Sequence, residues 1–189
     1  TETFRQWEVA GASHVDVPFE IEWAKVRNLR EGLSIEGVSP RDANCIVPAY
    51  STVPFRDVMN AAFEHLVVWV RDDIAPPIAE PLQVARMMPQ LQFARDEFGN
   101  ILGGIRLAEH AVATAKNTGM NSGTTNRFCF LYGSHEPFDQ ATLDKLYPSH
   151  DAYVDAVRAV VEENLAAGYI LPHAAEKTIR DAENSNIGR

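Results

Sequence analysis

A histidine stands three residues after a glycine near the start of the chain, in the run FRQWEVAGASHVD at residues 4–16. Residues 4–9 alternate so that Trp7 and Val9 can face a core, which predicts a short strand. Gly11 then permits a turn that leads to His14. A histidine presented in this way can serve as a general base, although the spacing alone favours a structural role.

A general base needs a nucleophile, and none stands in a recognisable motif. A nucleophile elbow requires G-x-S-x-G on a sharp turn between a strand and a helix. Ser13 has the first glycine but is followed by histidine and valine, and Ser122 and Ser134 do not fit the pattern either. The printed sequence therefore offers the base without its nucleophile.

Other chemistry receives weaker support from the residue types. Asp16 could orient His14, but triad carboxylates usually come from another strand end, so we expect Asp16 to be a solvated loop acid. Thr1 could be an N-terminal nucleophile, although that class needs many more strands than this sequence predicts. Gly103 and Gly104 lack phosphate-loop spacing and indicate close backbone packing or a bulge.

Metal ligation has two weak candidates in the sequence. His14, Asp16 and Glu20 could form one group, and His135 with Glu136 another. Neither matches a spacing such as H-E-x-x-H, so we expect no metal and no cofactor.

Composition excludes several classes of function. The chain has 189 residues and a formal net charge of -9, with a pI near 5.1. Its basic residues are scattered, which argues against nucleic-acid binding, and no apolar run is long enough to span a bilayer. Cys45 and Cys129 do not form a C-x-x-C pair, so they are either two buried thiols or a disulfide.

The remaining pattern predicts helices joined by loops and a hairpin. A helical turn is expected within residues 20–29, and the clearest helix covers residues 54–74, with Thr52 as its N-cap. A proline-rich connector at 75–89 precedes a hairpin at 91–107 with a Gly-Asn turn. Residues 116–127 should be a loop and 128–131 a short apolar run. Three helices are expected near 139–146, after Ser149 as far as Gly168, and from Pro172 to about 183.

Five segments, in order along the chain, resemble the C-terminal part of a bacterial and largely secreted α/β-hydrolase-domain family. They are similar to its strand with histidine loop, final core helix, hairpin, cysteine segment and C-terminal helix entry. In this sequence they are residues 7–16, 60–72, 96–106, 128–139 and 146–153.

The resemblance implies a role for each of three residues. His14 would be the family's general base, and Cys45 and Cys129 would form a disulfide. Because the order in this fold is serine, acid, histidine, the serine and acid would precede residue 1 or lie on another chain. The resemblance thus implies an α/β fold that is the C-terminal portion of a hydrolase, with a hairpin and a helical extension.

The resemblance leads to the following expectations. Residues 1–77 would be the end of the hydrolase core, and residues 78–189 a hairpin and helical extension packed on it. The partner would be a polypeptide with the G-x-S-x-G nucleophile, the substrate a small carboxylic or acyl ester, and the location secreted or periplasmic. One alternative is a non-catalytic accessory subunit of hydrolase-like shape. Another is a self-sufficient α+β domain in which His14 is only a loop residue.

Overall fold

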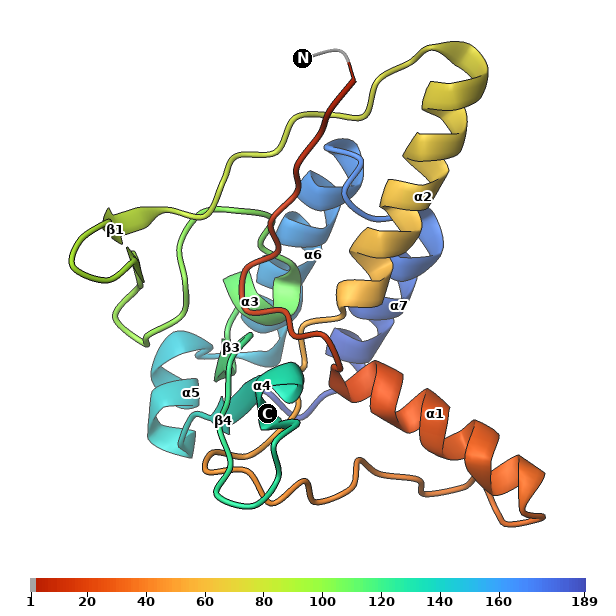
Figure 1. The fold of residues 1–189 in the computed structure, drawn as a ribbon. Helices are drawn as coiled ribbons and strands as arrows, with labels where there is room; N and C mark the ends of the chain where they lie inside the picture. Colours follow the sequence, from red (N-terminus) through yellow and green to blue (C-terminus); the bar gives the residue numbers. More distant parts are fainter. Residues whose placement is uncertain (1–2) are drawn as a thin grey trace.

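A computed structural model describes residues 3–189, so the Thr1 hypothesis lies outside the described residues. The helices differ greatly in length. The longer ones are α1 (Val17–Arg30), α2 (Phe55–Asp72), α6 (His150–Ala166) and α7 (Pro172–Glu183). The shorter ones are α3 (Ala108–Ala111), α4 (Cys129–Tyr132) and α5 (Gln140–Leu146). Helix α1 extends away from α2, α6 and α7, which lie together (Figure 1).

Strands are short and pair in two antiparallel sheets of two strands each within residues 3–189. Strand β1 (Val84–Arg86) pairs with β2 (Gln92–Phe93), and β3 (Ala115–Thr118) pairs with β4 (Ser134–Pro137). Residues 116–127 were expected to form a loop. This expectation was wrong for residues 116–118, which belong to β3. The apolar run at 128–131 forms most of α4 rather than a strand.

The helix signals in the C-terminal half were accurate. The Ser149 hydroxyl accepts from the Ala152 amide at 3.2 Å and caps α6, and Gly168 ends it with φ +77°. Helix α7 begins at Pro172, whose fixed φ suits the first turn of a helix. Helices α6 and α7 pack against each other.

The predicted hairpin turn is also present. Arg95 and Ile101 pair across it, and Gly99 adopts φ +86° between them. The Asp96 carboxylate accepts from the amides of Phe98 and Asn100 at 3.0 and 2.9 Å. Because Asp supplies this local acceptor and Gly the positive φ, the turn is specified by its own residues.

The expected strand at residues 4–9 is extended but is not part of a sheet. It makes a single parallel bridge, between Val9 and Ile105, through the Glu8 carbonyl and the Ala10 amide. The N–H groups of Trp7 and Val9 point to the other edge and have no hydrogen-bond partner among residues 3–189. This segment therefore presents an open edge.

The hydrophobic core joins both ends of the chain. It is centred on α6 and α7 and receives Val53 and Val58 from the N-terminal third. Ile105 and Leu107 enter it from the segment after the hairpin. The core thus draws on residues from both sides of residue 77. The domain boundary expected at that residue stays a prediction.

Candidate active site

His14 lies on a loop between the extended segment and α1, and its side chain is exposed to solvent. No hydrogen bond reaches its ring from any residue in the range 3–189. The ring is therefore available to a group approaching from outside. We call residues 11–17 the His14 loop.

The start of the His14 loop depends on a glycine. Gly11 adopts φ +72°, and a Cβ at this position would collide with Nδ1 of His110. The Ser51 hydroxyl donates to the Gly11 carbonyl at 2.7 Å. Conformation and close packing together require glycine here.

The end of the loop is held by two segments of the chain, those that carry Leu131 and Ser51. The Val15 amide donates to the Leu131 carbonyl at 2.9 Å, and the Val17 amide to the Ser51 carbonyl at 2.9 Å. Ser51 therefore contacts both ends of the loop, through its hydroxyl and its carbonyl. These bonds leave the His14 side chain exposed on a fixed backbone.

Asp16 is buried, with 2% of its surface exposed, so the expectation of a solvated loop acid was wrong. One carboxylate oxygen accepts from the Phe19 amide at 2.7 Å and the other from the Phe55 amide at 2.9 Å. Burial raises its pKa, and the two amide hydrogen bonds oppose that rise. Asp16 thus caps α1 and ties it to the first residue of α2.

Two of the three residues in the first candidate metal group, Asp16 and Glu20, are otherwise engaged. The Arg41 guanidinium donates to the buried Glu20 carboxylate at 2.7 Å, and Asp16 is occupied by amides. Across residues 3–189, no cluster of three His, Cys, Asp or Glu side chains is arranged to hold a metal ion. His135, from the second candidate group, contacts Asn117 instead.

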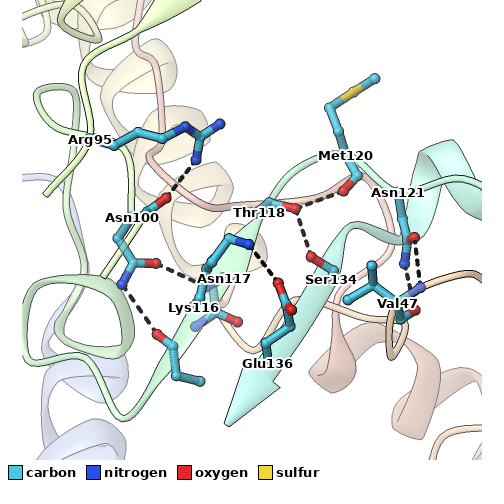
Figure 2. A network of polar contacts seen from close by, with 12 residues as sticks. Val47, Arg95, Asn100, Lys116, Asn117, Thr118, Met120, Asn121, Ser134 and Glu136 are labelled. Carbon is cyan, nitrogen blue, oxygen red and sulfur yellow. Dashed lines mark hydrogen bonds and ion pairs between the residues drawn. The ribbon is translucent and has the colours of Figure 1, made fainter. Parts of the chain in front are cut away.

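A buried amide network supports the segment that carries Ser51. The Asn117 side-chain oxygen accepts from the Thr52 amide at 3.2 Å and lies 3.0 Å from Nδ1 of His135. The Asn100 oxygen in turn accepts from the Asn117 amide at 2.9 Å (Figure 2). Burial lowers the pKa of His135. Thr52, expected to cap α2, is used here instead; the N-cap residue of α2 is Pro54, and the acceptor for the Phe55 amide comes from Asp16.

Sequence reasoning missed this network. Asn100 and Asn117 are 0% and 1% exposed, and a buried amide must find partners for its donors and acceptor. In the sequence, however, Asn100 lies in a turn and Asn117 in a polar segment, and their partners are distant along the chain, so nothing there marks them as buried.

A cavity of about 240 Å³ lies beside the loop and was also missed. Its lining includes Val17 and Pro18 at the start of α1, together with Asp57, Glu109 and Tyr153. Burial raises the pKa of Glu109 to about 7, and the nearby Asp57 charge adds to this rise. Glu109 can therefore change its protonation near neutral pH, but nothing directs it toward His14.

The predicted disulfide is confirmed. Cys45 and Cys129 are bonded, with their Cα atoms 5.7 Å apart and a sequence separation of 84. Among residues 3–189, no helix has the length and hydropathy needed to cross a bilayer. The disulfide is compatible with a secreted or periplasmic protein.

Comparison with known families gives one result. The model of a family described as "Alpha/beta hydrolase domain" matches residues 1–180. No curated protein and no solved structure matches significantly. Since the match covers nearly the whole sequence, the chain belongs to the α/β-hydrolase domain family.

Proposed function

We propose that His14 is the general base of a serine hydrolase that acts on carboxylic or related acyl esters. The nucleophilic serine and the acid would come from a preceding segment or a separate chain. His14 would take the serine proton during acyl-enzyme formation and return a proton to the leaving group. The observation that carries this proposal is an exposed imidazole on a loop whose backbone is anchored at both ends.

Family membership supports the reaction class. Hydrolases of this fold place their histidine late in the chain order, after the serine and the acid. The printed sequence contains no G-x-S-x-G. If His14 is the general base, the nucleophilic serine must therefore lie outside the printed sequence.

The surface supports a polypeptide partner of this kind. The outward face of α2 is apolar and exposed, with Val70 81% exposed. Its other exposed members are Met59, Phe63, Leu66 and Val67. Phe4, which begins the extended segment, is also exposed, so an apolar helix face accompanies an open strand edge on one chain.

These two features specify the occupant by its chemistry. An open edge with free amides of Trp7 and Val9 is completed by another strand. A contiguous apolar face such as that of α2 is usually buried against a partner in soluble proteins. A polypeptide that brings strands and an apolar surface, and that carries the nucleophile elbow, satisfies both. The disulfide is consistent with assembly in an oxidising compartment, secreted or periplasmic.

The experiment compares His14→Ala with His173→Ala in the assembled protein. His173 is an exposed histidine on α7, so its replacement controls for loss of an imidazole. We expect His14→Ala to lower kcat for a chromogenic ester by about 10³-fold or more, since general acid–base catalysis alone contributes about 10²–10⁴. His173→Ala should leave kcat unchanged.

Labelling of the partner separates the alternatives. A fluorophosphonate probe should label a serine on the co-purifying polypeptide, and the labelling should slow in His14→Ala. Full ester hydrolysis by His14→Ala would overturn the assignment. A partner without a reactive serine would instead favour the accessory-subunit interpretation.

A further inference from the structure

We propose that the Cys45–Cys129 disulfide is a positioning element for the His14 loop. Its catalytic consequence rests on the proposed function, while its effect on the loop does not. The disulfide joins the two segments of chain that hold the loop. One is residues 45–51, which ends at Ser51, and the other is α4, which contains Leu131.

Helix α4 buries little side-chain surface of its own. It is only Cys129–Tyr132, and Cys129 is its buried residue, with 1% of its surface exposed. Phe130 and the preceding Phe128 are 54% and 61% exposed, so these large side chains contribute little burial. The disulfide at Cys129 is therefore a strong constraint on the position of α4, beside the backbone hydrogen bonds of Leu131 and Tyr132.

The His14 loop depends directly on α4. The Leu131 carbonyl, two residues after Cys129, accepts from the Val15 amide next to His14. The neighbouring Tyr132 carbonyl accepts from the Ser51 amide at 3.1 Å. Displacement of α4 would thus remove one loop contact outright and loosen the residue that provides two more.

The segment between Cys45 and Ser51 transmits the constraint. The Asn121 amide group donates to the Val47 carbonyl at 2.9 Å (Figure 2). It also donates to the Gly133 carbonyl at 2.8 Å. The rings of Tyr50 and Tyr132 lie 4.9 Å apart. These contacts align the two segments, and the disulfide closes the end of the pair that is farthest from Ser51.

Helix α1 cannot replace this support. Its buried residues are Glu20 and Ala24, while Phe19, Trp23 and Leu29 are exposed. Little of α1 is therefore packed against the described chain. The orientation of His14 therefore depends on the segments that carry Ser51 and Leu131 rather than on α1, which follows the loop.

The test measures amide hydrogen exchange in the full chain with and without the disulfide. In Cys45→Ser, we expect the protection of the Val15 amide to fall about tenfold or more beyond any fall at Val161 in α6. The matched control is Val157→Ala, which lowers global stability through α6. It should reduce protection at both amides alike.

Two results would overturn the proposal: unchanged protection at Val15, or an equal fall at Val15 and Val161 in Cys45→Ser. If Cys45→Ser does not fold, the folded wild-type protein is titrated with a phosphine reductant and followed by amide NMR signals. Loss of all signals together would also overturn it. Selective loss around Val15 and Leu131 would support it.

The catalytic consequence has its own readout. In the assembled enzyme, Cys45→Ser should lower kcat for the ester while KM stays within about twofold, because the base rather than the binding surface is displaced. If His14→Ala has no effect on hydrolysis, the proposed function fails, whereas the exchange result at Val15 still decides the positioning of the loop.

Discussion

Helices α2 and α6 both carry apolar residues at helical spacing, but the apolar face of α6 is buried whereas much of that of α2 is exposed to solvent. In α6, Val157 and Val161 are each 2% exposed and lie in the core against α7. In α2, Val58 is buried at the first turn, but Phe63 and Val70 face solvent farther along. An apolar stripe therefore predicts a helix with a covered face, and it does not say whether the cover belongs to the same chain.

The largest expected stability effect lies on the α6 side. Val157→Ala should lower the free energy of unfolding by about 2–3 kcal/mol, because it removes two buried methyl groups and leaves a void. Urea denaturation of the isolated chain measures this. A loss below about 0.5 kcal/mol would mean that α6 is not the core helix of this chain.

The next effect concerns the protonation of Glu109, in the wall of the cavity between these helices. Its pKa is raised to about 7 from an unfolded value near 4.5, so the folded state binds the proton more tightly. The resulting stabilisation is complete below about pH 4.5 and is lost as the pH rises through about 7. The full shift corresponds to about 3 kcal/mol, and solvent screening of the partly exposed Glu109 reduces the loss expected for wild type relative to Glu109→Gln to about 2 kcal/mol.

The comparison with Glu109→Gln is needed because other groups titrate in the same range. Asp57, whose pKa is also raised by burial, acts in the same direction. His110, whose pKa burial lowers, acts in the opposite direction. Parallel stability curves for the two proteins from pH 4.5 to 8 would contradict the assignment to Glu109.

A smaller effect on stability is expected at Asp16, which links the start of α1 to the start of α2. Asp16→Ala removes the acceptor for the Phe19 and Phe55 amides and should cost about 1 kcal/mol, as for other helix caps. Asp16→Asn keeps one carbonyl acceptor and should recover part of this loss. Circular dichroism during thermal unfolding distinguishes the two variants, and equal melting temperatures in all three proteins would rule out the double cap.

The smallest effect belongs to the outer face of α2. Val70→Ser should change the free energy of unfolding of the isolated chain by less than about 0.5 kcal/mol, since the side chain is already exposed. The same substitution should weaken capture of the partner polypeptide. A stability loss as large as that of Val157→Ala would show that this face is covered within the chain.

The sequence was most informative where a signal is local. The cap at Ser149, the stop at Gly168 and the Asp96–Gly99 turn each depend on residues within a few positions, and the structure has all three. Helix α2 was predicted within two residues at each end. Local chemistry specifies these elements without help from the rest of the fold.

Features that depend on distant partners were not predictable. Strand β3 looks like a loop because its residues are mostly polar, and its pairing partner β4 begins sixteen residues after β3 ends. Residues 4–9 look like a strand, but a strand needs neighbours on its edges, and the described chain provides one bridge. The family-like segments indicated the disulfide correctly, and they indicated His14, whose catalytic role stays a prediction.

The contact between Gly11 and His110 limits how this protein can vary in sequence. His110 is fully buried, and its Nε2 donates to the Ile101 carbonyl at 2.8 Å, which fixes the ring against the glycine. A larger residue at position 11 would need a smaller residue at position 110, and it would still carry the strain of a φ of +72°. A library that varies both positions should therefore yield folded members mainly among glycine–histidine pairs.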